Sequence, residues 1–225
     1  MSAVGVDGCK QGWIAIALRD REPAEGQFVT SLDELLDAIP DAQAVAIDIP
    51  IGLPTSGRRR ADIEARALLG ARRNSVFLTP VRDAISARSH AEATAKARSI
   101  TGSGISRQAF ALAPKIREAE RWSAAVPLPV WEVHPEVSFA IMMGGPAAWP
   151  KSTWSGLRER QRALERVGIS LDDVGPAGTR AGADDVLDAA AAAWSAARLL
   201  RGEGISLPDP PETSPGSTNP MAIWA

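Results

Sequence analysis

The chain has 225 residues, of which 45% are hydrophobic and 23% charged, the composition of an ordinary globular protein that can bury a core. Its single cysteine, Cys9, excludes an internal disulfide framework and favours a reducing compartment, and we expect a soluble, cytoplasmic protein. The most apolar stretch, residues 186–200, contains Asp188 and is too short to span a bilayer, so no membrane partner is expected. A net charge of −2 excludes a protein that is basic all over, but a local basic face for nucleic acid remains open.

The first fifty residues predict strands, a short helix and a further strand. Residues 2–7 and 12–18 have β-type patterns and are joined by a glycine-containing turn, and residues 26–30 form a plausible third strand. A capping box at Ser31 and Glu34 predicts a helix to about residue 39. Residues 44–49 then form an apolar run interrupted only by Asp48, which is typical of a strand covered on both faces.

The rest of the chain predicts mostly helices. We expect helices over 58–69, from Ser89, from Ser106 with an interruption at Pro114, over 155–167, and from an Asp184 cap to about 201, with one strand over 130–134. Residues 208–220 are expected to be a loop or tail, and residues 221–224 a short terminal strand. The element order predicts a single α/β domain over residues 1–225. It has an RNase H-like mixed five-stranded sheet flanked by helices, and a mostly helical insertion over about residues 55–125 after the fourth strand.

Acidic residues near the strand ends are the main candidates for chemistry. Asp7 ends one apolar strand and Asp48 lies within another, where an ionised carboxylate is costly unless it is paired or bound to a cation. Asp185 and Asp188 share one face of the closing helix, and the alanines that follow allow this helix to approach the sheet closely. Capping and pairing with arginine are the structural alternatives. Converging carboxylates are the ligands of Mg²⁺ or Mn²⁺, and the sequence has neither a zinc-binding Cys/His spacing nor a phosphate-binding P-loop.

Two further groups of residues are candidates. Glu132, His134 and Glu136 would face one way if the strand continued through Pro135, and a metal ligand, a general base and a buried pair all remain open. Basic side chains that could contact phosphates of a nucleic acid also occur, against the alternative of a solvated face. They are Lys10, Arg58, Arg59, Arg60, Arg66 and Lys115. The tryptophans are expected to be packing residues rather than platforms for nucleic-acid bases.

Five motifs in this order resemble a known family over roughly residues 4–200. The motifs are residues 4–13 (VGVDGCKQGW), 47–54 (IDIPIGLP), 75–80 (SVFLTP), 114–118 (PKIRE) and 132–136 (EVHPE). Together they are similar to the domain-of-unknown-function family 429, described as predicted RNase H-like nucleases. Residues 185–189 (DVLDA) also resemble the closing helix of Holliday-junction resolvases. The resemblance implies Asp7, Asp48, Asp185 and Asp188 as metal ligands, although the second-strand acid of the resolvases is a glutamate, for which Glu132 could compensate.

The hypothesis at this point is a metal-dependent nuclease that uses two metal ions about 4 Å apart, with Asp7, Asp48, Glu132, His134 and Asp188 as the candidate catalytic residues. Nucleic acid is the expected partner. A binding or regulatory protein without hydrolase activity is one alternative. A phosphoryl-transfer enzyme is another, although the sequence has no second glycine-rich phosphate hairpin.

Overall fold

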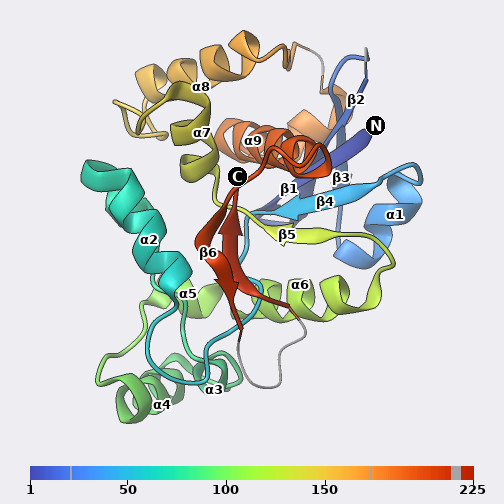
Figure 1. The fold of residues 1–225 in the computed structure, drawn as a ribbon. Helices are drawn as coiled ribbons and strands as arrows, with labels where there is room; N and C mark the ends of the chain where they lie inside the picture. Colours follow the sequence, from blue (N-terminus) through green and yellow to red (C-terminus); the bar gives the residue numbers. More distant parts are fainter. Residues whose placement is uncertain (21, 173, 214–218) are drawn as a thin grey trace.

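The computed structural model describes residues 1–20, 22–172, 174–213 and 219–225, and it is organised around a five-stranded mixed sheet (Figure 1). The strands, in the order β3-β2-β1-β4-β5 across the sheet, are β3 (Glu25–Val29), β2 (Gly12–Arg19), β1 (Ser2–Cys9), β4 (Ala44–Ile47) and β5 (Val130–Glu132). β1, β2 and β3 pair antiparallel, whereas β4 lies parallel to both β1 and β5. This strand order and these directions confirm the predicted RNase H-like α/β class.

The first two strands form a tight hairpin, and Gly12 follows its turn. Cys9 pairs with Gly12, which leaves Lys10 and Gln11 as the two turn residues. A Cβ atom at Gly12 would lie 2.1 Å from the carbonyl oxygen of Val29. Only glycine therefore allows β3 to approach β2 this closely.

The helices, in chain order, are η1 (Leu32–Glu34), α1 (Leu35–Ala38), α2 (Arg60–Leu69), η2 (Gly70–Ser75), α3 (Arg82–Ile85), α4 (His90–Thr101), α5 (Arg107–Ala111), α6 (Ala113–Ala125), α7 (Pro135–Met143), α8 (Trp154–Arg166), η3 (Gly175–Thr179) and α9 (Ala183–Leu200). The longest helices, α6, α8 and α9, lie in the second half of the chain. Among the described residues, no helix combines the length and apolar character needed to cross a bilayer.

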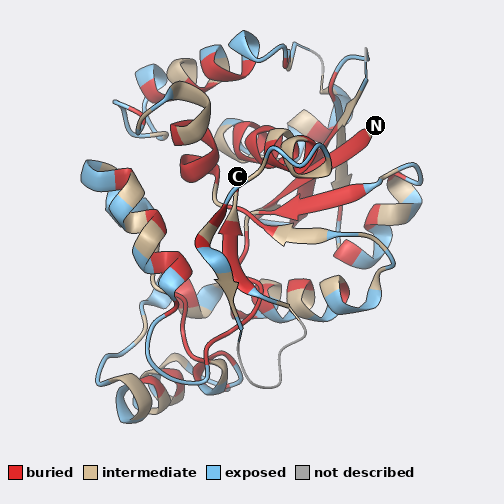
Figure 2. Cartoon of the chain, in the orientation of Figure 1, coloured by how far each residue is buried: buried red, intermediate tan, exposed pale blue. Residues whose placement is uncertain are grey.

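The sheet has a covering layer on each face. Side chains of β1, β2 and β4 pack with Ile116, Ala119 and Trp122 of α6 and with α1 on one face. On the other face, α9 lies against the middle of the sheet, with α7 and α8 outside it (Figure 1). β1, β4 and most of α9 are buried, which fits their apolar sequences (Figure 2).

The helical insertion after β4 contains α2 to α6 and matches the predicted segment. The break at Pro114 is confirmed, since α5 ends at Ala111 and α6 begins at Ala113. The Ser89 hydroxyl accepts the N–H of Glu92, as a helix cap should. The predicted cap at Ser31 is wrong, because its side chain makes no capping hydrogen bond and Glu34 instead accepts from the N–H and hydroxyl of Thr30.

The end of the chain forms a second, two-stranded sheet. β6 (Ser206–Glu212) and β7 (Met221–Trp224) pair antiparallel, and Trp224 bridges to Val133 beside the main sheet. The predicted terminal strand is therefore confirmed. The prediction of a loop from residue 208 is wrong up to Glu212, and residues 214–218 lie outside the described part of the chain.

Candidate metal centre

Two of the candidate carboxylates come from neighbouring parallel strands. Val6 pairs with Ile47, and the N–H of Asp48 donates to the carbonyl of Val6 at 2.9 Å. Asp7 and Asp48 directly follow this residue pair on their two strands. Both therefore lie at the same level of the sheet, at its carboxyl edge. Asp48 lies just beyond β4 rather than inside the predicted strand. The carboxyl edge of parallel strands is where α/β sheets place their ligands.

The third carboxylate arrives on α9, which touches the first strand at Gly5. A Cβ atom at Gly5 would lie 2.0 Å from the backbone nitrogen of Ala193 and 2.1 Å from the carbonyl oxygen of Ala189. The missing side chain and the small alanines thus allow backbone-to-backbone contact between β1 and α9. Because Asp188 precedes this contact on α9 and Asp7 follows it on β1, the two carboxylates are brought together.

Asp7, Asp48 and Asp188, called here the acid cluster, can each place one carboxylate oxygen within 4.8 Å of the others. Oδ1 of Asp7 accepts the N–H of Gly8 at 2.7 Å, and Oδ2 of Asp188 is paired with the ammonium of Lys151. Oδ1 of Asp188 is buried and has no hydrogen-bond partner among the described residues. An unsatisfied buried acceptor costs free energy, so this oxygen needs a further donor or cation.

The pKa values of all three carboxyl groups are raised. Burial is the main cause for Asp7, whose pKa is also raised by Asp48 and Asp188. Burial and the charge of Asp188 raise the pKa of Asp48 to about 8. Burial raises the pKa of Asp188 to about 6, with Lys151 opposing the shift. The single ammonium therefore compensates the acid cluster only in part.

This donor set fits a hard divalent cation. All three side chains offer carboxylate oxygen, which Mg²⁺ and Mn²⁺ prefer, and a bound cation would satisfy the buried oxygen of Asp188. It would also reverse the electrostatic cause of the raised pKa values. The acid cluster can thus hold a metal ion.

Asp185, the fourth carboxylate implied by the resolvase resemblance, is not part of the acid cluster. Its Oδ2 accepts the N–H of Gly182 at 2.9 Å, at the start of α9. The predicted cap at Asp184 is wrong, because the residue that precedes the helix is Gly182 and Asp184 lies inside the first turn. Asp185 thus acts at the helix terminus in this structure.

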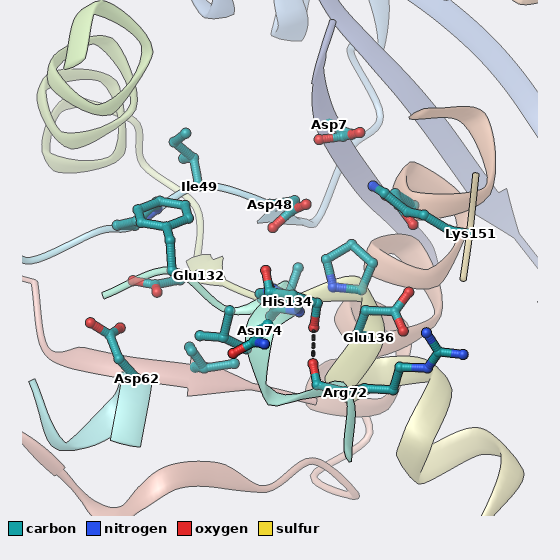
Figure 3. A pocket seen from close by; sticks show the side chains of 18 of the residues that line it. Asp7, Asp48, Ile49, Asp62, Arg72, Asn74, Glu132, His134, Glu136 and Lys151 are labelled. Atoms are coloured by element: carbon teal, nitrogen blue, oxygen red, sulfur yellow. Dashed lines mark hydrogen bonds and ion pairs between the residues drawn. The ribbon is translucent and has the colours of Figure 1, made fainter. Parts of the chain in front are cut away.

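The acid cluster opens into a cavity of about 600 Å³. Figure 3 shows Asp7, Asp48 and Lys151 converging on one side of this cavity, with Asp62 and Glu132 across from them. Polar and charged groups of the loop after β4, of η2, of α7 and of the loop before α8 complete the wall. The cavity is large enough for a nucleotide-sized group beside the carboxylates.

Opposite the acid cluster lies a second group of buried charges, Arg59, Asp62 and Glu132, called here the arginine cluster. The guanidinium of Arg59 contacts both oxygens of Glu132 at 2.6 and 2.7 Å and Oδ1 of Asp62 at 2.6 Å. Glu132 also accepts the N–H of Ile51 at 2.6 Å, and Asp62 that of Thr79 at 2.6 Å. Arg59 is only 1% exposed and its guanidinium is paired with both carboxylates, so it holds the loop after Asp48 to β5.

The 132–136 motif does not form one continuous strand. β5 ends at Glu132, and Pro135 begins α7, as a proline in the first turn of a helix does. His134 therefore lines the cavity, with Nε2 3.3 Å from the carbonyl oxygen of Ser75, and burial lowers its pKa. Glu136 forms a buried ion pair with Arg160 of α8 at 2.6 Å. The condition under which the three side chains would share one strand face is therefore not met, because the chain leaves β5 after Glu132 and enters α7 at Pro135.

The remaining predicted phosphate contacts lie away from the cavity wall. Arg60 pairs with Glu64 at 2.9 Å, and Arg66 donates to the carbonyl of Val76 at 2.6 Å. Lys115 donates to the carbonyl of Gly12 at 2.6 Å and lies 3.9 Å from the ring centre of Trp13. Lys10 and Arg58 are exposed, and neither lines the cavity.

Besides Arg59, the cavity wall contains Lys151, Arg72 and Arg160, three cationic residues that are not among the predicted phosphate contacts. Lys151 comes from the loop between α7 and α8, and Arg72 from η2, where its Nε donates to the carbonyl of Ala147 at 3.0 Å. Neither residue has a spacing to the aspartates that would indicate proximity. The one sequence signal for Lys151 is its place after a run of glycine, proline and tryptophan, a loop composition that often carries function.

Comparison with known proteins gives one match. No curated protein and no solved structure shows significant similarity to the chain. A family model described as "Protein of unknown function (DUF429)" matches residues 5–213, which include the acid cluster, the arginine cluster and the loop of Lys151. The chain therefore belongs to this family.

Proposed function

We propose that the protein is a metal-dependent phosphodiesterase that hydrolyses nucleic acid at the acid cluster. The observation that carries the proposal is the meeting of three carboxylates from β1, β4 and α9 within 4.8 Å, on the wall of an open cavity. Such a cluster with a buried, unpartnered oxygen is arranged for cations rather than for a neutral ligand. When bound, Mg²⁺ or Mn²⁺ would lower the pKa of a water molecule and stabilise the departing oxygen.

The side chains around the carboxylates have separate tasks in this proposal. Asp7, Asp48 and Asp188 would hold the metal, with Asp185, one turn earlier on α9, as a further ligand only if it leaves the N–H of Gly182. Lys151 can turn its ammonium from Asp188 to a phosphate oxygen, since its side chain is 42% exposed. The arginine cluster fixes the loop that follows Asp48. His134 lies on the cavity wall, and its Nδ1 is a buried atom without a hydrogen-bond partner among the described residues.

Lys151 also favours a second candidate function. Its ammonium already supplies positive charge to the acid cluster. The ion pair of Lys151 and Asp188 could therefore belong to a binding or regulatory protein that needs no metal and has no hydrolase activity. The two functions differ in whether divalent cations bind and activate. A metal screen therefore decides between them.

The experiment is a cleavage screen with Mg²⁺ or Mn²⁺ on single- and double-stranded DNA, RNA and hybrids. We expect metal-dependent cleavage of at least one substrate, and loss of most turnover in Asp7→Asn, Asp48→Asn and Asp188→Asn, because each removes a ligand charge. Asp184→Asn is the matched control, since it lies on the same turn of α9 as Asp185 but outside the acid cluster. Asp185→Asn shows whether a fourth carboxylate is required. Absence of cleavage by pure wild-type protein, or full activity in the three variants, would reject the proposal.

A further inference from the structure

Two tryptophans of the segment that carries Lys151 are turned towards solvent. Trp149 is 56% exposed and Trp154 is 75% exposed, which makes them the most exposed large apolar side chains among the described residues. They flank Lys151, whose ammonium contacts Asp188. Single exposed apolar residues are common, but two exposed indoles that flank the cavity-lining residues 150–152 in the sequence indicate a binding surface.

The backbone that carries Trp149 is held in place from several sides. The carboxylate of Glu159 accepts the N–H groups of Ala148 and Trp149 at 2.8 and 3.0 Å. Arg160 donates to the carbonyl of Trp149 at 3.1 Å, and Arg72 fixes the preceding residues from the other side of the cavity. The exposure of the indole is therefore a property of an anchored loop. A fixed aromatic side chain loses little conformational entropy on binding.

Trp154 begins α8, and the same face of this helix is basic. Arg158 and Arg162 follow at i+4 and i+8, and Arg162 is exposed. The Arg158 guanidinium lies 5.9 Å from the ring centre of Trp154. Gly156 joins α8 to the loop, because a Cβ atom there would lie 1.9 Å from the carbonyl oxygen of Pro150. The Trp154 ring and Arg158 thus lie side by side on α8, and this helix packs against the loop that carries Trp149.

We propose that Trp149 and Trp154, called here the tryptophan platform, stack with unpaired bases of a single-stranded nucleic acid, while Lys151, Arg158 and Arg162 contact its phosphates. The inference rests on the proposed function and names its substrate class. In a duplex the faces of the bases are covered by their neighbours, so aromatic side chains that stand free in solvent match a single strand. The strand would pass from α8 over Lys151 to the acid cluster.

The test measures binding without cleavage, in EDTA, using labelled 20-nucleotide dT and rU strands and a duplex of the same length. We expect the wild type to bind one or both single strands more tightly than the duplex. Trp149→Ala and Trp154→Ala should each weaken single-strand binding by roughly tenfold, because stacking on an aromatic ring has about that effect per base. Trp149→Phe and Trp154→Phe should restore most of the affinity. Ile63→Ala, at another exposed apolar side chain, is the control and should bind like wild type.

Several outcomes would overturn the platform. These are equal or tighter binding of the duplex, unchanged affinity in both alanine variants, and a change of oligomeric state in those variants with no change in affinity, which would assign the indoles to a protein interface. Melting curves of each variant exclude misfolding as the cause. Failure of the platform is distinct from failure of the proposed function: cleavage that persists in the alanine variants leaves the nuclease standing, whereas tryptophan-dependent binding without any cleavage leaves the platform standing.

Discussion

The acid cluster and the arginine cluster face each other across one cavity, and they differ in how completely their charges are compensated. In the arginine cluster all four carboxylate oxygens of Asp62 and Glu132 accept hydrogen bonds, and Arg59 contacts both side chains. In the acid cluster one ammonium faces three carboxylates, and a buried oxygen of Asp188 has no partner among the described residues. Both groups are made of buried charge, yet only in the arginine cluster does every carboxylate oxygen have a hydrogen-bond partner.

The difference separates a structural role from a functional one. Removing charges from water is costly, and proteins offset the cost by pairing and hydrogen bonding. A group completed within the chain, like the arginine cluster, holds the loop after β4 to β5. In the acid cluster a hydrogen-bond acceptor is left without a partner in the described part of the chain, and a bound ligand can supply the missing donor or cation. The same comparison predicts opposite effects when a charge is removed from each cluster.

The largest effect is expected in the arginine cluster. Arg59→Met leaves Asp62 and Glu132 buried without their cation, and should lower the free energy of unfolding by about 3–5 kcal/mol, measured by urea denaturation. Arg60→Met is the control, because its ion pair with Glu64 is on the surface and should contribute less than about 1 kcal/mol. If the two variants are equally stable, the arginine cluster does not have the structural role assigned to it.

Much of the fold and part of the site were predictable because they depend on local patterns. The apolar runs and glycine turn of the first strands, the break at Pro114 and the apolar run before Asp48 all correspond to observed elements. Asp7 and Asp48 could be paired because parallel strands end at one edge of a sheet. The alanines after Asp188 indicated a close approach of the last helix, and the contact at Gly5 confirms it.

The rest depends on contacts between residues far apart in the chain. Nothing local distinguishes Arg59, which is buried, from its neighbour Arg60, which is exposed; the difference is Glu132, 73 residues away. Lys151 meets Asp188 across 37 residues and carries no motif. The place of Glu136 stayed open because the sequence pattern did not decide whether the strand continues through Pro135, and its partner Arg160 lies 24 residues away. The exposure of Trp149 and Trp154 is likewise set by the anchoring of their loop and not by composition.

A second prediction tests whether close packing of α9 creates the acid cluster. Gly5→Ala places a methyl group against the backbone of α9 and should lower the free energy of unfolding by about 1–3 kcal/mol. Because α9 must move, Asp188 should leave the cluster, and the variant should lose its response to divalent cations in a melting experiment. Gly145→Ala is the control, since a Cβ atom there meets nothing within 4 Å. If the Gly5→Ala protein still responds to metal, the contact between Gly5 and α9 does not determine whether Asp188 joins the acid cluster.

A third prediction concerns pH in the absence of metal. The folded protein keeps protons on the acid cluster that the unfolded chain releases above about pH 4, with the pKa of Asp48 at about 8. Unfolding therefore releases protons, and the free energy of unfolding should fall as pH rises from about 4 to 8. The lowered pKa of His134 acts in the opposite direction, so the measurement compares wild type with Asp48→Asn, in which His134 is unchanged.

Denaturation in EDTA at several pH values checks this prediction. Asp48→Asn should show a flatter profile than wild type and should be the more stable of the two at pH 8, because it lacks the uncompensated charge. Glu132→Gln should instead be less stable than wild type at pH 8, since it removes a partner of Arg59. Parallel pH profiles for wild type and Asp48→Asn would mean that the charge of Asp48 is compensated in the folded protein, contrary to the contrast with the arginine cluster.

The smallest effect is expected from the metal itself. At ten times its dissociation constant, Mg²⁺ or Mn²⁺ should stabilise the native state by about 1.4 kcal/mol, which corresponds to a rise in melting temperature of roughly 3–5 °C for a chain of this size. Asp7→Asn and Asp48→Asn should lose this rise, whereas Arg60→Met should keep it. Lys151→Met should have a lower melting temperature than wild type in EDTA but a larger rise with metal, because the ammonium and the cation compete for Asp188. Equal metal-induced rises in melting temperature in wild type and Asp48→Asn would show that the cations bind elsewhere. The acid cluster would then not be a metal site, and the contrast with the arginine cluster would carry no functional meaning.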